Sequence, residues 1–107
     1  MTYYLCHDYS GNHANITKAR KSLARLQKND LANCYVCPVV AFPILENPNI
    51  DHDSKMELFY DMMTLCDAVV VGYYITDEMA KQIEFARLIK MEVFNIDSNG
   101  KIQPFKE

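Results

Sequence analysis

Short apolar runs and longer mixed stretches alternate along the chain, and each change of pattern predicts a change of secondary structure. Residues 2–6 are rich in β-forming side chains and stop at a polar loop, which is typical of a strand. Residues 12–28 then place Ala19, Leu23 and Leu26 at helical spacing. The opposite face of this helix is interpreted as a solvated surface that carries the basic residues Lys18, Arg20, Lys21 and Arg25.

The same alternation continues to the end of the chain. Further strands are expected at residues 35–40, 67–72, 91–96 and 101–105, and further helices at residues 53–66 and 77–90. Ser54 or Asp53 is expected to cap the first of these helices and Thr76 the second. The run DAVVVG is apolar and rich in β-branched residues, which indicates a central parallel strand covered on both faces.

This order of elements predicts the α/β class, with a parallel, flavodoxin-like or Rossmann-like sheet of about five strands in a three-layer sandwich. The length of 107 residues suits a single domain over residues 1–107. In a flavodoxin-like strand order, 2-1-3-4-5, a ligand binds beyond the carboxyl ends of the first and third strands. That point brings residues 7–11 beside residues 72–76, including Gly11 and Gly72.

Composition narrows the classes of function and location. A net charge of -3 and a pI near 5.5 argue against nucleic acid or an anionic membrane as the main partner. No apolar run approaches the roughly 18 residues that span a bilayer, and the start lacks the basic residues of a signal peptide, so a cytoplasmic location is expected. The four cysteines are interpreted as small hydrophobic residues, and neither they nor His52, between Asp51 and Asp53, predict a metal site.

Three segments, in this order, resemble one known superfamily. They are YLCHDYSGN with the following NITKA, LCDAVVVG, and ITDEMAKQIEFARLIKMEVF. The first is similar to a strand followed by a Tyr-Ser-Gly loop, the second to an aspartate before a strand, and the third to a Ser-x-Gly-x-x-x-Glu-Ile helix before a strand. Over residues 2–95 the chain thus resembles the nucleoside 2-deoxyribosyltransferase-like superfamily, including its small bacterial and phage branches of unknown function.

The resemblance implies a site and a reaction. A glutamate on the last helix attacks the anomeric carbon of a nucleoside or nucleotide, releases the base and forms a glycosyl-enzyme, because the transition state carries positive charge that a carboxylate stabilises. By position, Tyr9, Ser10 and Gly11 match the loop that holds the ligand, Asp67 matches the aspartate, and Thr76 matches the serine.

The chain departs from this pattern at two positions. Glu78 stands where the family has glycine, and Gln82 stands where it has the nucleophilic glutamate. An uncharged amide cannot replace that carboxylate as a nucleophile. Glu78 lies four residues earlier and therefore on the same helical face, so it is the candidate for a relocated catalytic carboxylate. The alternative is that Asp77 and Glu78 only complement the positive end of the helix dipole.

Other residues near the expected site suit a nucleoside. Tyr9, Tyr73 and Tyr74 are candidates to stack on a base, and His7 is a candidate binding residue. Carboxylates at the start of the last helix disfavour a phosphate there. A phosphate is better received at the start of the first helix, around residues 11–15, although Asp8 opposes it. A neutral nucleoside or free base is thus at least as consistent with the sequence as a nucleotide.

The sequence leaves three functions open. The first is a protein that binds a nucleoside or nucleotide without cleaving it, and the second is a nucleoside deoxyribosyltransferase or N-glycosidase that uses Glu78 or an activated water. The third is a protein with a vestigial pocket that acts through protein contacts. No cofactor is expected. The resemblance implies a homo-oligomer in which a neighbouring chain completes the site.

Overall fold

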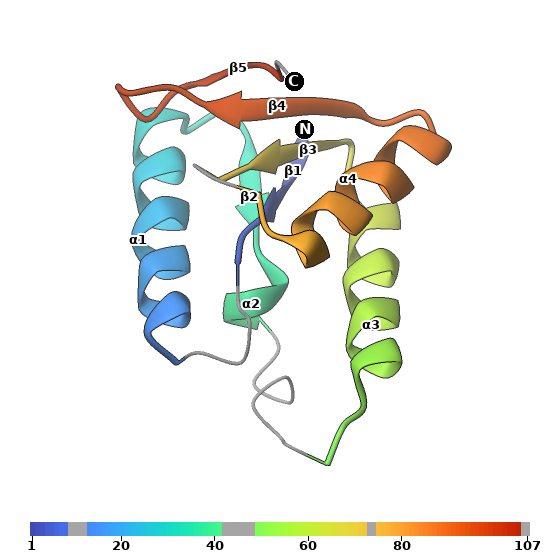
Figure 1. Cartoon of the computed structure of the whole chain (residues 1–107). Coiled ribbons are helices and arrows are strands. Elements are labelled where there is room, and N and C mark those ends of the chain that lie inside the picture. The colour runs from blue at the N-terminus through green and yellow to red at the C-terminus, as the bar shows by residue number, and fades with distance from the viewer. Residues whose placement is uncertain (9–12, 42–48, 73–74, 106–107) are drawn as a thin grey trace.

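The computed structural model describes residues 1–8, 13–41, 49–72 and 75–105 (Figure 1). Its elements, in chain order, are β1 (Thr2–Cys6), α1 (His13–Asn29), β2 (Cys34–Val36), α2 (Pro38–Ala41), α3 (His52–Thr64), β3 (Ala68–Val71), α4 (Asp77–Leu88), β4 (Glu92–Ile96) and β5 (Ile102–Pro104). The α/β class expected from the alternating pattern is confirmed.

The five strands form one sheet in the order β2-β1-β3-β4-β5, which is the flavodoxin-like of the two orders that the sequence left open. Strand β1 pairs in parallel with both β2 and β3, and β3 pairs in parallel with β4. The expectation of a purely parallel sheet is wrong, because β5 runs antiparallel to β4. The short link between these two strands cannot cross over the sheet as a parallel connection must, so the chain reverses in a hairpin.

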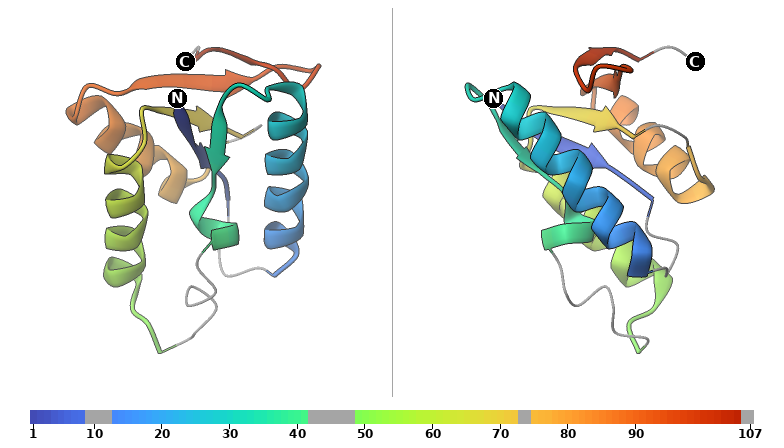
Figure 2. Two further views of the ribbon diagram at one scale, coloured as in Figure 1. Left: turned by 180° about the vertical axis from the view of Figure 1, so that it is seen from behind. Right: turned by 90° about the vertical axis from the view of Figure 1, so that its left-hand side faces the viewer.

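Side chains of the central strands alternate between two hydrophobic clusters, because successive residues of a strand face opposite sides of the sheet. Tyr3 and Leu5 belong to the cluster that contains Ile16, Ala19 and Leu26 of α1. The other cluster joins residues of β1 and β3 to α4, and its members are Tyr4, Cys6, Met63, Val69, Val71, Met79, Ile83 and Ala86. Figures 1 and 2 show α1 and α4 on opposite sides of the sheet.

Helix α3 contributes to both clusters and runs beside α4. Met56 and Phe59 pack in the α1 cluster, whereas Met63 packs in the α4 cluster. The ring of Tyr60 stacks on that of Phe85 in α4, with ring centroids 4.3 Å apart. Figure 1 shows α3 and α4 side by side, running in a similar direction.

One predicted boundary and one predicted cap differ clearly from the structure. The strand expected over residues 35–40 ends at Val36, and α2 begins at Pro38. Proline has no backbone N–H to donate to a sheet ladder but is well tolerated at the start of a helix, which explains the change. Helix α3 is capped by Asp51, not by Ser54 or Asp53, because the Asp51 carboxylate accepts from the Ser54 N–H at 2.7 Å.

Within the part of the chain that the structure describes, no helix is both long and apolar enough to cross a membrane.

Candidate functional site

A cavity of about 250 Å³ lies where β1 and β3 end. Its lining residues come from the ends of these strands and from the helices on either side, and they are His7, Asp8, Asn15, Lys18, Lys21, Ser22, Gly72 and Met79. The Gly72 N–H donates to the Cys6 carbonyl oxygen at 3.0 Å, so the two strand ends are adjacent. The connections to β2 and β4 leave this point in opposite directions, and in open α/β sheets ligands bind at such a point.

One wall of the cavity is a single face of α1. Asn15, Lys18 and Ser22 are spaced by three and four residues, which places them in one row along the helix, and Lys21 lies beside them. This row lies next to the buried residues of α1, which begin with Ile16. Because those residues pack on the sheet, the row faces the strand ends. The basic stretch that was interpreted only as a solvated face therefore also lines a cavity.

The residues that follow β1 form a second wall. Asn15 is only 8 % exposed, and its Nδ2 donates to the Asp8 carboxylate at 3.3 Å. His7 Nδ1 lies 3.0 Å from the Asp8 carbonyl oxygen, which accepts a hydrogen bond from Nδ1 when that nitrogen carries the proton. These contacts fix the direction of the Asp8 carboxylate relative to α1. The wall thus offers a hydrogen-bond acceptor to a ligand.

Gly72 closes the cavity next to His7. A Cβ added at Gly72 would lie 3.5 Å from His7 Cδ2, an ordinary van der Waals contact. The surrounding protein therefore has room for a methyl group at this position, and its packing does not require glycine. What an added side chain would change is the space beside His7 that a ligand can use.

The charges on the lining are unequal. Two lysines and one aspartate line the cavity, whereas the whole chain has a net charge of -3. Within the described residues, no carboxylate oxygen lies within 4 Å of the ammonium group of Lys18 or Lys21. Among the described residues, the lining therefore has an excess of positive charge, which lies on the α1 wall.

Gln82, at the position of the family nucleophile, does not line this cavity. It is 3 % exposed, and its amide oxygen accepts from the Tyr4 hydroxyl at 2.6 Å and from the Cys6 thiol at 3.5 Å. Burial raises the pKa of Tyr4 and the pKa of Cys6, so both groups stay protonated and act as donors. Gln82 joins α4 to β1 inside the core.

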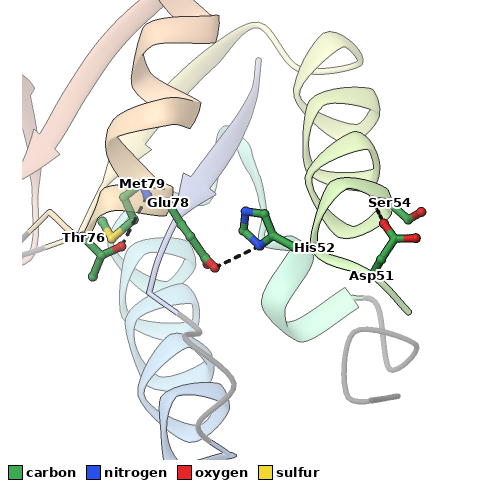
Figure 3. A network of polar contacts seen from close by, with 6 residues as sticks. All are labelled: Asp51, His52, Ser54, Thr76, Glu78 and Met79. Atoms are coloured by element: carbon green, nitrogen blue, oxygen red, sulfur yellow. Dashed lines mark hydrogen bonds and ion pairs between the residues drawn. The ribbon is translucent and has the colours of Figure 1, made fainter. Parts of the chain in front are cut away.

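Glu78, the candidate for a relocated carboxylate, faces α3. Figure 3 shows its side chain and that of His52 pointing toward each other, with 3.5 Å between Glu78 Oε1 and His52 Nδ1. The side chains are 32 % and 50 % exposed, respectively. Glu78 is not among the residues that line the cavity. Its observed role is to link the first turns of α3 and α4.

Thr76 and Asp67 also make structural contacts. The Thr76 hydroxyl oxygen accepts from the Met79 N–H at 3.3 Å and caps α4 (Figure 3), as its sequence position predicted. Asp67 precedes β3, and its carboxylate accepts from the Thr2 N–H at 2.7 Å. Asp67 and Gly72 stand at the two ends of β3, and the cavity lies at the Gly72 end. Asp67 therefore lies at the opposite end of the strands from the cavity.

The structure thus brings together His7 and Gly72 from the predicted set. Tyr9, Ser10, Gly11, Tyr73 and Tyr74 lie outside the described residues. Sequence reasoning missed the α1 wall of Lys18, Lys21 and Ser22. The signal for it was the row of polar residues three and four positions apart that starts at Asn15, next to the apolar stripe.

A larger hollow of about 590 Å³ lies between α4, a residue shortly before it and the residue that follows β5. Its lining is mainly apolar and consists of Ile75, Ala80, Ile83, Glu84, Arg87, Leu88 and Phe105. The Arg87 guanidinium lies over the Phe105 ring, 5.5 Å from its centroid. We place the candidate site in the smaller cavity, because binding of a polar small molecule depends on polar groups that converge on it.

No protein-family model matches the sequence, and comparison with curated proteins finds no match either.

Proposed function

We propose that this protein binds a nucleoside or nucleotide-like small molecule in the cavity at the ends of β1 and β3, without the covalent glycosyl transfer that the family resemblance implies. The observation that carries the proposal is that the cavity and the residue at the nucleophile position are separate. The cavity with its polar lining lies at the strand ends, while the residue at the nucleophile position is buried against Tyr4.

The burial of Gln82 is the main support for binding without cleavage. Nucleophilic attack needs a charged oxygen that reaches the anomeric carbon, with reacting atoms about 3–3.5 Å apart. The Gln82 amide is neutral, and its oxygen already accepts two hydrogen bonds inside the core. A ligand in the cavity has no access to it, since Gln82 is not part of the lining.

The size and polarity of the cavity support a ligand with the bulk of one nucleoside. Its volume of about 250 Å³ is close to the lower limit of about 300 Å³ for typical small-molecule pockets. The Asp8 carboxylate suits the hydroxyl groups of a sugar or the N–H groups of a base, and Met79 adds an apolar contact. A dinucleotide would need a larger cavity.

A second candidate function is cleavage of an N-glycosidic bond, with Glu78 as the carboxylate. The observation that favours it is that Glu78 is partly exposed and held by His52, so that a substrate of this reaction would bind beside the first turns of α3 and α4 and not in the cavity. In this alternative the protein is a hydrolase or transferase of nucleosides or nucleotides.

The proposal also covers the layers of the fold, self-association, cellular location and partners. Two separate hydrophobic clusters on the two faces of the sheet support a three-layer, flavodoxin-like single domain. Exposed apolar side chains support self-association, and these are Leu65, Ile75, Leu88 and Ile89. A cytoplasmic location and the absence of a nucleic-acid partner are parts of the same proposal, and the net charge supports the second of them.

The test is incubation of the purified protein with nucleosides, deoxynucleosides and nucleotides, with binding followed by thermal shift and free base by chromatography. We expect ligand-dependent stabilisation without release of base. Ser22→Phe fills the cavity from α1 and should abolish the shift, while Ala24→Phe, on an exposed position of the same helix, should retain it. Release of base that disappears in Glu78→Gln would establish the alternative, and a shift that survives Ser22→Phe would place binding elsewhere.

A further inference from the structure

We propose that the ligand of this cavity is a nucleotide, whose phosphate is held by Lys18 and Lys21 of α1. The inference rests on the proposed function, because it takes the cavity as the site and specifies the chemical class of its occupant. From the sequence alone, a neutral nucleoside or free base was at least as consistent as a nucleotide. The positions of the two lysines in the structure favour the nucleotide.

The two lysines are spaced to share one anion. They stand three residues apart on a helix, so their Cβ atoms are about 5–6 Å apart and their flexible stems can converge on one phosphate. Ser22 lies on the same wall and can add a hydroxyl donor. Phosphate oxygens only accept hydrogen bonds from such groups, so the wall matches a phosphate in both charge and donor character.

The lysines differ from basic residues that have structural tasks. Arg25 donates to the Ser98 carbonyl oxygen, and Arg87 lies over the Phe105 ring. Lys18 and Lys21 have no carboxylate within 4 Å among the described residues, yet they line a concave surface. Positive charge gathered in a cavity of an acidic protein attracts anions to that cavity.

The opposite wall gives the ligand a direction. Asp8 repels a phosphate but accepts hydrogen bonds from hydroxyl and N–H groups, and Asn15 holds its carboxylate near the start of α1. A ligand with an anionic end toward Lys18 and Lys21 and a donor-rich end toward Asp8 satisfies both walls. A nucleoside monophosphate has these two ends within the bulk that the cavity admits.

The competing location for a phosphate is less favourable. The first turn of α4 contains Asp77 and Glu78, whose carboxylates repel an anion. The first turn of α1 contains no acidic residue. The phosphate is therefore expected at the α1 side of the cavity, and not at the start of α4 where the family resemblance places sugar-orienting groups.

The test compares nucleosides with their 5′-monophosphates by calorimetry at low ionic strength, with inorganic phosphate as a separate ligand. Lys18→Gln/Lys21→Gln is the test variant. Lys28→Gln/Lys81→Gln, which removes the same charge outside the cavity, is the matched control. All four side chains are exposed, so both variants should fold.

We expect each monophosphate to bind at least about tenfold more tightly than its nucleoside, since a charge-assisted hydrogen bond contributes about that factor. The test variant should lose this advantage and bind nucleoside and monophosphate with similar affinity, whereas the control should keep it. Added salt should weaken binding of the monophosphate and leave binding of the nucleoside unchanged.

Other outcomes separate the two proposals. Equal affinity for nucleoside and monophosphate, or an advantage that survives Lys18→Gln/Lys21→Gln, would overturn the phosphate site and leave nucleoside binding in place. Binding of inorganic phosphate as tight as that of any monophosphate would show an anion site but overturn the nucleotide as its ligand. Failure of nucleosides and monophosphates alike to bind would overturn both proposals.

Discussion

The two ends of the sheet use polar side chains in different ways. At the amino end, Asp67 accepts from the Thr2 N–H, and Gln27 both accepts from the Tyr35 N–H and donates to the Asn33 carbonyl oxygen. Each of these side chains completes hydrogen bonding of the backbone. At the carboxyl end, Lys18 and Lys21 line a cavity without a carboxylate partner among the described residues.

Gln82 in the interior follows the pattern of the amino end. The Gln82 amide is buried, and its oxygen accepts from Tyr4 and Cys6. Polar groups that stabilise a fold are expected to be satisfied internally, whereas polar groups that bind a ligand must be available to it. The comparison therefore predicts that substitutions at the amino end and in the core lower stability, and that substitutions in the cavity change binding.

The largest effect is expected in the core. Gln82→Leu leaves the buried Tyr4 hydroxyl without its partner, and this should lower the free energy of unfolding by about 1–3 kcal/mol. Urea denaturation measures the change. The double variant Tyr4→Phe/Gln82→Leu removes both polar groups and should recover most of the loss. If Gln82→Leu alone is as stable as the wild type, the hydrogen bond contributes nothing.

A smaller loss is expected at the amino end. Asp67→Ala removes the acceptor of the Thr2 N–H, and we expect a loss of about 0.5–1 kcal/mol because that contact is exposed to solvent. Binding of nucleosides should stay unchanged, because Asp67 lies at the edge of the sheet opposite the cavity. A loss of binding in Asp67→Ala with intact stability would contradict the assignment of the two ends.

Acid should weaken the amino end through Asp30. Hydrogen bonds from Asn33 and Tyr35 lower the pKa of Asp30 below its usual value of 3.8. A carboxyl whose pKa is lower in the folded state stabilises the fold fully above its unfolded pKa, and this contribution is lost as the pH falls through the folded pKa. Between about pH 5 and 3, which brackets the unfolded pKa of a carboxyl, the urea midpoint of Asp30→Asn should therefore fall less than that of the wild type. An unchanged pH dependence would assign the acid sensitivity to other carboxyls, and Glu57→Gln is the exposed control.

The smallest effect has the opposite sign. Lys18→Gln/Lys21→Gln removes repulsion between like charges three residues apart on α1, which should raise the free energy of unfolding by about 0.2–0.5 kcal/mol. Thermal unfolding without ligand measures it, with Lys28→Gln/Lys81→Gln as the control. A clear loss of stability in the test variant would show that these lysines help to hold the fold and would weaken the contrast between the two ends.

The α/β class followed from the sequence because local patterns of apolar residues sufficed for it. Strand β3 is a short run of β-branched residues, buried on both faces as its composition predicted. The direction of β5 was missed, although the Asn99-Gly100 turn signalled a hairpin; Gly100 has a φ of 77°, which favours glycine. The helical start at Pro38 was missed because the apolar residues around it fit a strand equally well.

The site was harder to predict because its geometry depends on contacts between distant parts of the chain. The partner of Gln82 is 78 positions away, so no local pattern reveals that the amide is buried. The resemblance gave Gln82 a place in the site, while tertiary packing placed it in the core. Lys18 and Lys21 were recognised as exposed, but only the packing of α1 beside the strand ends shows that they line a cavity.

The central position of β1 has a consequence for the order of events during synthesis. Strand β1 precedes both of its partners in the chain, yet it pairs with β2 on one side and β3 on the other. While the ribosome is still adding the residues between β1 and β3, the backbone of Leu5 lacks its partner in β3, because Val70 has not emerged. Apolar strands that stay unpaired until a distant partner is synthesised are prone to aggregate. The centre of the sheet can therefore close only late in translation, after β3 has left the ribosome.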